Sequence, residues 1–180
     1  MCCLNIFFIE TLIKQHNRPL RHGVSERNTL LNWIQIDTIE DARKAYTSGA
    51  DAIIVQGNEA GGHTYTGMPL LALLPAVRDV AGDRLVLGAG GIADGRTAAV
   101  VLASGADGII LGTRLVATRE ANAHDEYKRR LLEANGEDTV ITHAYGLERP
   151  AFNPMQIIRN QTVTIWENCI DELPKKPSQA

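Results

Sequence analysis

The sequence has few aromatic residues and no long run of basic residues. Phe, Tyr and Trp make up 5% of its 180 residues, and the formal net charge is −3. A nucleic-acid-binding surface would need clustered Lys and Arg, or aromatic platforms for the bases. We therefore expect the partners to be small molecules or other protein chains, and not nucleic acid.

Cysteine is also scarce. Three residues, two of them adjacent (Cys2 and Cys3), fit neither a disulfide framework nor the spacing of a zinc site. We predict free thiols, no metal site and a cytoplasmic protein. The apolar start, residues 1–9, lacks a basic segment and ends at Glu10. It is typical neither of a signal peptide nor of a membrane span.

Glycine and short apolar runs are plentiful. Continuous apolar runs are typical of strands buried on both faces of a parallel sheet. Strands are predicted at 33–36, 51–56, 85–89 and 107–111, and helices at 38–48, 69–81, 97–104 and 122–134. A weaker strand at 139–142 and a segment at 155–160 follow. This alternation predicts an α/β fold of βαβ units with a parallel sheet.

An internal repeat favours a barrel over an open sheet. Residues 48–55, Ser-Gly-Ala-Asp-Ala-Ile-Ile-Val, return at 104–111 as Ser-Gly-Ala-Asp-Gly-Ile-Ile-Leu. Two successive βα units would give this offset. Since a complete (β/α)₈ TIM barrel needs roughly 250 residues, we predict its C-terminal half, strands 5–8. The predicted organisation is an irregular segment 1–30, a partial barrel 31–166 and an exposed tail 167–180. Open sheet edges would favour self-association.

Three loops follow the carboxyl ends of predicted strands, where parallel α/β folds place their function. The first, residues 56–63, has two adjacent glycines before His63, and an imidazole side chain can serve as a general acid or base. The second, residues 88–95, has four glycines in eight positions and precedes a helix, as an anion cradle does. The third, residues 112–114, brings a glycine and a hydroxyl to a helix start. The last two predict the phosphate site that many barrels form after strands 7 and 8.

The second loop also fits a loose dinucleotide-binding fingerprint, Gly88-x-Gly90-x-x-Ala93. In that fingerprint the acidic residue ends the second strand. Asp107, at about the right separation, begins one instead. We therefore reject the dinucleotide interpretation.

Together the three loops resemble the nitronate monooxygenase (2-nitropropane dioxygenase-like) family. Residues 49–63 are similar to the family signature that contains its catalytic histidine. Residues 88–96 and 111–115 are similar to its two FMN-phosphate segments, in the same order and at similar spacing. The likeness runs from Trp33 to Trp166 and includes the late Ile158-Arg159-Asn160.

The resemblance implies a barrel that holds FMN without a covalent bond and oxidises alkyl nitronates with dioxygen. It implies that His63 is catalytic, as a base or as a positioning group beside the nitronate, and that Gln56 contacts the flavin. The remaining implied cofactor-binding residues are Gly61 and Gly62 along the flavin ring, and Gly90, Gly91, Gly112 and Thr113 at the phosphate.

Three alternatives stay open. A flavin-dependent enoyl reductase of the same barrel family would share the histidine loop and the phosphate loops. A truncated, catalytically inactive remnant would keep the motifs without turnover. A flavin-free barrel would bind another phosphate ligand. Whether the chain alone retains FMN separates the flavoenzymes from the last two.

Overall fold

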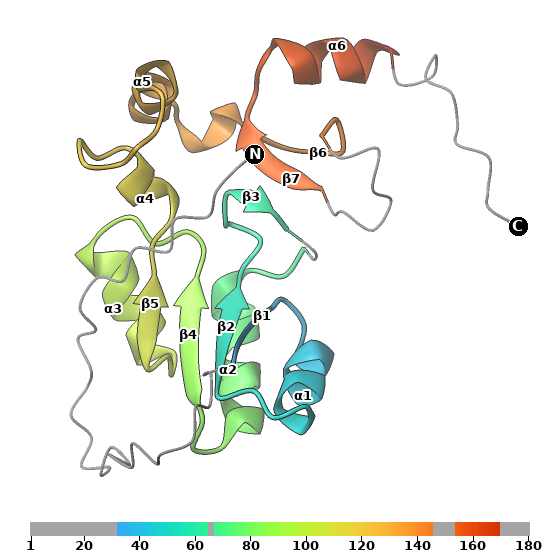
Figure 1. The fold of residues 1–180 in the computed structure, drawn as a ribbon, viewed down its shortest axis with the longest axis vertical. Coiled ribbons are helices and arrows are strands. Elements are labelled where there is room, and N and C mark those ends of the chain that lie inside the picture. Colours follow the sequence, from blue (N-terminus) through green and yellow to red (C-terminus); the bar gives the residue numbers. More distant parts are fainter. Residues whose placement is uncertain (1–31, 65–66, 146–153, 170–180) are drawn as a thin grey trace, which may run out of the picture.

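The computed structural model describes residues 32–64, 67–145 and 154–169. The predicted segment 1–30 and residues 170–180 of the predicted tail lie outside this part of the chain. Four strands form a parallel sheet in the order β1-β2-β4-β5 (Figure 1). Their bounds are β1 Trp33–Ile36, β2 Ala52–Gln56, β4 Leu85–Ala89 and β5 Gly108–Ile110. Each strand lies beside the next one along the chain, as in consecutive units of a (β/α)₈ barrel, which confirms the predicted fold class.

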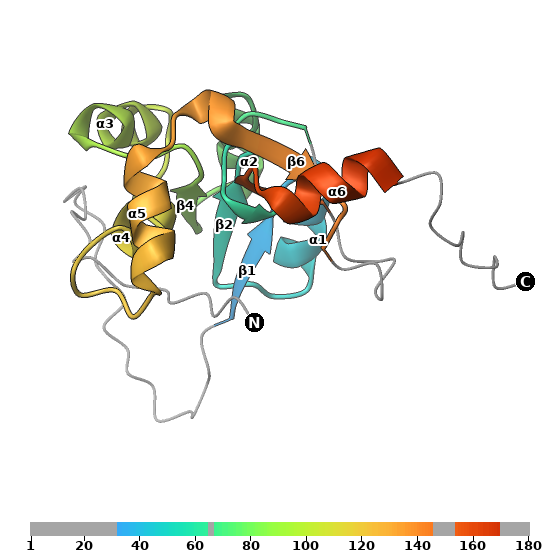
Figure 2. The same ribbon diagram turned by 90° about the horizontal axis from the view of Figure 1, so that it is seen from above.

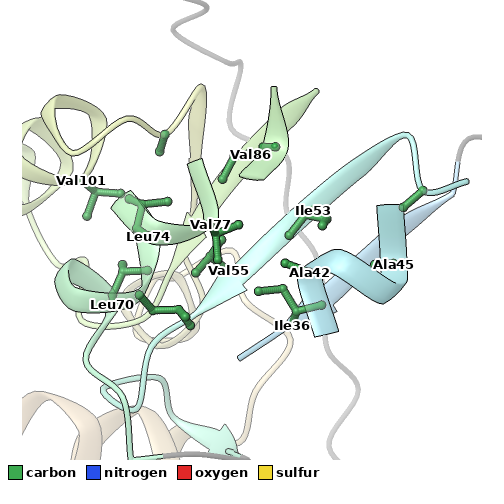
Figure 3. Close-up of a cluster of buried hydrophobic side chains, with 14 of the residues drawn as sticks. Ile36, Ala42, Ala45, Ile53, Val55, Leu70, Leu74, Val77, Val86 and Val101 are labelled. Atoms are coloured by element: carbon green, nitrogen blue, oxygen red, sulfur yellow. The ribbon is translucent and has the colours of Figure 1, made fainter. Parts of the chain in front are cut away.

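Three helices cover one face of this sheet: α1 Ile39–Thr47, α2 Leu70–Ala81 and α3 Gly95–Ala103. The main core lies between them and the strands (Figure 3). Ile53 and Val86, which are register partners, are fully buried there, as are Leu74 and Val77 of α2. Each such side chain contributes about 1.5–3 kcal/mol through its removal from water. The helix layer thus holds the strands in place.

Alternate residues of the strands face the other way, toward what is the interior of a complete barrel. Ile54, Leu87 and Ala89 form a second, smaller cluster there, with Trp33 and Ile110 packed against it. These residues come from all four strands of the sheet. The strands therefore carry apolar side chains on both faces, as the continuous apolar runs predict.

The sequence repeat is a repeated junction between helix and strand. Gly49 and Gly105 have φ of 88° and 107°, which suits glycine and ends the preceding helix. The next residue then donates to the helix, Ala50 N to Ala45 O at 3.0 Å and Ala106 N to Val101 O at 3.4 Å. The two halves of the repeat therefore stop a helix in the same way.

The aspartate of each repeat pairs with the neighbouring strand. Asp51 donates its N–H to Asn32 O at 2.9 Å and accepts the N–H of Asn32 at 2.7 Å. Asp107 does the same with Val86, at 2.8 and 2.9 Å, and also accepts from Arg78 at 2.8 Å. In both copies of the repeat, the aspartate thus fixes the register between its own strand and the neighbouring one.

A second, antiparallel sheet lies beyond the carboxyl ends of the parallel strands (Figures 1 and 2). Its order is β3-β7-β6, with bounds β3 Gly62–His63, β7 Met155–Ile158 and β6 Thr139–Thr142. The helices near it are α4 Thr113–Val116, α5 Asp125–Glu133, the 3₁₀ turn η1 Gly136–Asp138 and α6 Gln161–Cys169. The pairing of β3 with β7 and the helix α6 were not predicted, and of α4 only the start at 112–114 was. A two-residue strand and a four-residue helix have too few positions to show a period.

Several predicted bounds shift for identifiable reasons. The helix predicted at 97–104 begins at Gly95, because Asp94 caps it by accepting from Arg96 N and Thr97 N. The helix predicted at 122–134 begins only at Asp125, because the His124 side chain accepts from Glu126 N. Residues 167–169, assigned to the exposed tail, belong to α6, which begins after Asn160. Among the described residues, no helix is long and apolar enough to cross a membrane.

We expect Asp107→Ala to lower the free energy of unfolding by about 1–3 kcal/mol, because both a guanidinium and a buried strand N–H lose their acceptor. Denaturant unfolding followed by circular dichroism measures the change. Asp51→Ala is the matched control: it breaks the same backbone pairing at Asn32, which is exposed, so water replaces the carboxylate. Equal losses of unfolding free energy in the two variants would contradict the stabilising role given to the hydrogen bonds of Asp107 with Arg78 and Val86.

Candidate functional site

The three glycine-rich loops meet at one edge of the parallel sheet. They follow β2, β4 and β5, which are neighbours in the sheet, so their carboxyl ends lie side by side. The main-chain N–H of Gly57, after β2, donates to Ala89 O at the end of β4 (2.9 Å). The loops after β2 and β4 are thus joined where they leave the sheet.

Contacts between the loops are close because glycines stand at the contact points. A Cβ atom on Gly90 would lie 3.1 Å from Ala60 N and 3.2 Å from Gly57 O. Gly90 also has φ of 107°. A Cβ atom on Gly61 would lie 2.9 Å from the Thr113 hydroxyl, at the start of α4. The histidine loop therefore touches both predicted phosphate loops.

Other glycines differ in their surroundings. A Cβ atom on Gly88 would lie 2.5 Å from Val101 Cγ1, so this glycine lets α3 pack on β4. A Cβ atom on Gly62 or Gly112 would meet no atom within 4 Å among the described residues. Gly88 therefore has a structural role, whereas Gly62 and Gly112 border open space beside the loops.

Glu59 ties the histidine loop to α2. Pro69, which precedes the helix, makes no side-chain cap. The Glu59 carboxylate accepts the N–H of Leu70 instead, at 3.0 and 3.2 Å. Asn58 adds bonds to the chain before the helix, to Gly67 O and from its own N–H to Met68 O, both at 2.9 Å. The loop is consequently anchored at a helix N-terminus, where the dipole favours an acid.

His63 is held by strand pairing. Gly62 and His63 pair with Gln156 and Met155 of β7, and Thr64 N donates to Pro154 O at 2.9 Å. With its amide oriented so that the nitrogen faces the loop, Gln156 donates to Asn58 O at 2.5 Å and to Ala60 O at 3.3 Å. The backbone of the predicted catalytic residue is thus fixed from a segment far along the chain.

Gln56 links the parallel sheet to the histidine strand. It is buried, and its amide donates to His63 O at 2.9 Å. Its oxygen accepts from the Gln35 amide of β1 at 2.6 Å. The two amides therefore form a chain of hydrogen bonds from β1 to the backbone of His63. Gln35 was missed from the sequence, although strand alternation with Ile34 and Ile36 places it on the same face as Gln56.

The acidic groups near the loops are satisfied by backbone donors. The N–H of Thr97, followed by the Arg96 guanidinium, keeps the pKa of Asp94 below its usual value. Asp94 also takes the first N–H groups of α3, those of Arg96 and Thr97. Donors for a bound anion would then come from the glycine loop itself and from the N–H groups that begin α4, because Leu115 N and Val116 N already donate to Gly112 O, at 2.9 and 3.2 Å.

A family model described as "Nitronate monooxygenase" matches residues 15–168 of the chain. The chain belongs to the nitronate monooxygenase family. It is 40% identical over 149 residues to a nitronate monooxygenase of Neurospora crassa, covering 77% of this chain and 36% of that protein. It is 47% identical over 171 residues to (3aS,4S,5R,7aS)-5-hydroxy-7a-methyl-1-oxo-octahydro-1H-indene-4-carboxyl-CoA dehydrogenase of Mycobacterium tuberculosis, covering 89% of this chain and 46% of that one. The family resemblance seen in the sequence is confirmed.

Solved structures agree with this membership. The nitroalkane oxidase of Streptomyces ansochromogenes superposes with a TM-score of 0.66 at 36% identity, covering 76% of this chain and 40% of that one. FabK of Thermotoga maritima superposes with a TM-score of 0.68 at 33% identity, covering 78% and 43%. The chain spans less than half the length of each of these four proteins. Within the family of oxidoreductases, it corresponds to the part that carries the three loops.

The structure thus brings the predicted site residues to one edge: Gln56, Gly61, Gly62, His63, Gly90, Gly91, Gly112 and Thr113 lie on the three loops or at the strand ends that carry them. Direct contacts join Gln56 to His63, Gly61 to Thr113 and Gly90 to Ala60. The sequence did not reveal Gln35, Glu59 or Gln156, which hold these residues through hydrogen bonds. Among the described residues, no cluster of His, Cys, Asp and Glu could hold a metal ion.

We expect Gly90→Ala to lower the free energy of unfolding by about 1–3 kcal/mol, because its backbone is strained for any other residue and a Cβ atom would press on the backbone of the histidine loop. Gly95→Ala is the control. Gly95 also follows β4, but a Cβ atom there meets nothing within 4 Å, and alanine suits a helix. Urea midpoints compare the two. A loss for Gly95→Ala as large as that for Gly90→Ala would contradict the close approach.

Proposed function

We propose that this chain carries the FMN-binding and catalytic loops of an oxidoreductase that oxidises alkyl nitronates with dioxygen. The observation that carries the proposal is the meeting of the histidine loop with both glycine-rich loops, through Gly61 against Thr113 and Gly90 against Ala60. Family membership supports the same reaction. Three loops joined in this way suit one ligand that spans them all.

The residues fit FMN. Open space at Gly62 and Gly112 leaves room for a flat ring and a phosphate beside the backbone. Gln56 would contact the flavin, Gly61 and Gly62 would line its ring, and the phosphate would be held by Gly90, Gly91, Gly112 and Thr113. Backbone N–H groups at a glycine loop and a helix start suit such an anion. FMN, when bound, supplies the electron-transfer chemistry.

His63 would act on the substrate. With a neutral nitroalkane, an imidazole can accept the proton from the carbon that bears the nitro group, which leaves the nitronate. With a nitronate already formed, a protonated ring nitrogen can donate a hydrogen bond that holds the anion. Either role requires a fixed position. The pairing of β3 with β7 and the hydrogen bond from Gln56 to His63 O supply it.

Reduction of an enoyl thioester is the second candidate. It is favoured by the 47% identity to a protein that is named a carboxyl-CoA dehydrogenase, whose substrate is therefore a CoA thioester. The purified chain would first be examined for visible flavin absorbance. Oxygen consumption with ethyl nitronate would then be compared with reduction of crotonyl-CoA by a reduced nicotinamide. A colourless protein that turns over neither substrate would contradict both candidates.

We expect His63→Ala to retain FMN and to lose turnover of ethyl nitronate by about 10²–10⁴-fold, since a positioned acid or base contributes on that order. Flavin absorbance and an oxygen electrode measure the two properties. The control is His143→Ala, because His143 is exposed after β6 and outside the three loops. A His63→Ala variant as active as His143→Ala would remove His63 from its role.

We expect Gly91→Asp to lose FMN, because its carboxylate would repel the phosphate. Gly91 has φ of 66°, so substitution also strains the backbone. Gly91→Asn has the same shape and strain without the charge, and should bind FMN at least tenfold more tightly than Gly91→Asp. Fluorescence titration with FMN measures both affinities. Equal affinities would contradict the phosphate assignment.

A further inference from the structure

The parallel sheet has two free edges, formed by β1 on one side and by β5 on the other (Figure 1). Among the described residues, no strand pairs with the outer side of either one. Neither strand contains a charged residue or a proline, which are two means by which proteins protect an exposed edge. The backbones of both edge strands can therefore pair with another chain.

Apolar side chains are less buried at these edges than at the centre of the sheet. The central strands β2 and β4 carry fully buried side chains under the helix layer. On the same face, Ile34 of β1 and Ile109 of β5 are only partly buried. On the inner face, Trp33 of β1 and Ile110 of β5 are likewise only partly buried, although they pack against the inner apolar cluster. Both layers of the core are therefore incomplete at both edges.

A groove of about 420 Å³ lies beside the free edge of β1. Ile34 and Ile36 of β1 line it, and so do Asp41 and Lys44 of α1. The last two side chains form an ion pair with each other at 3.6 Å. Asp37, which directly follows β1 and also lines the groove, therefore makes the groove acidic. A neighbouring strand on this edge would meet apolar side chains along β1 and a negative charge at its carboxyl end.

The other edge carries the opposite charge. Arg114 lies in α4, just after the carboxyl end of β5, and is exposed. Among the described residues it takes part in no ion pair. Because parallel strands that pair bring their carboxyl ends to the same rim, β5 placed beside β1 of another copy would bring Arg114 to the end that holds Asp37. The two edges are thus complementary in charge.

We propose that two copies of this chain close one eight-stranded barrel, in which β5 of each copy pairs with β1 of the other. A two-fold axis along the barrel keeps all strands parallel and joins both pairs of edges at once. Pairing of like edges, β1 with β1, would leave both β5 edges free. The described sheet has four strands, half the number in the barrel of this fold. Closure therefore removes every free edge with two copies.

The mass of the protein in solution is the first test. Light scattering during gel filtration of the full chain should give twice the chain mass of 19.6 kDa. A monomer would overturn the proposal. A series of larger assemblies would overturn it as well, because a closed ring of two copies has no edge left to extend.

Mixing two edge variants tests which edges meet. Trp33→Lys on β1 and Ile110→Asp on β5 should each raise the dissociation constant of the dimer about tenfold or more, because each dimer then buries two charges. An equimolar mixture should recover dimers, since one β5–β1 interface of the mixed dimer is unaltered and the other joins opposite charges. Circular dichroism confirms that both variants fold. Folded variants that stay dimeric alone, or that stay monomeric when mixed, would overturn the proposal.

A surface variant tests the charge at the rim without altering either strand. Arg114→Glu should raise the dissociation constant about fivefold, the upper range for an exposed ion pair. Arg43→Glu is the matched control, because Arg43 is exposed on α1, changes the net charge equally and does not line the groove. Analytical ultracentrifugation measures both constants. Equal constants for the two variants would contradict the placement of β5 beside β1.

The dimer is independent of the proposed function. None of these measurements uses flavin or turnover. A dimer that binds no FMN would support the closed barrel and contradict the proposed function, whereas a yellow, active monomer would do the reverse.

Discussion

The close approach of two backbones at the carboxyl edge of the sheet governs this structure. Gly90 lies so near Ala60 and Gly57 that a side chain would separate the loops. Because the loops after β2 and β4 touch there, Gly61 reaches Thr113 after β5. The three loops can meet only if the ends of β2, β4 and β5 lie level with one another. The helices that pack against these strands hold them in that position.

Two kinds of feature could be predicted from the sequence. Continuous apolar runs such as Ala52–Gln56 revealed the buried strands. Parallel strands, in turn, place their loops at one edge, and this predicts that His63 and the two other glycine-rich loops lie together. The glycine-aspartate repeat was also visible in the sequence. In the structure the glycine ends a helix, and the aspartate that follows, Asp51 or Asp107, accepts a hydrogen bond from the neighbouring strand and so fixes the register.

What escaped prediction depends on contacts between distant segments. Strand β3 has only two residues and no period of its own; it exists because β7 pairs with it. Gln35 belongs to no motif, and only the three-dimensional register of β1 and β2 brings its amide to Gln56. Glu59 stands within the signature, yet its bond to Leu70 N at the α2 terminus is a tertiary contact. Local patterns thus locate the site, whereas distant pairing fixes its geometry.

The pairing of His63 with Met155 has a consequence for the order of folding. These partners are 92 residues apart in the sequence, whereas β1, β2, β4 and β5 each pair with a near neighbour along the chain. Contacts of long sequence separation form late, because a long loop must close first. During synthesis the parallel sheet and its glycine loops can assemble while β7 is still within the ribosome. The histidine would then reach its final position last, after the two other glycine-rich loops have formed.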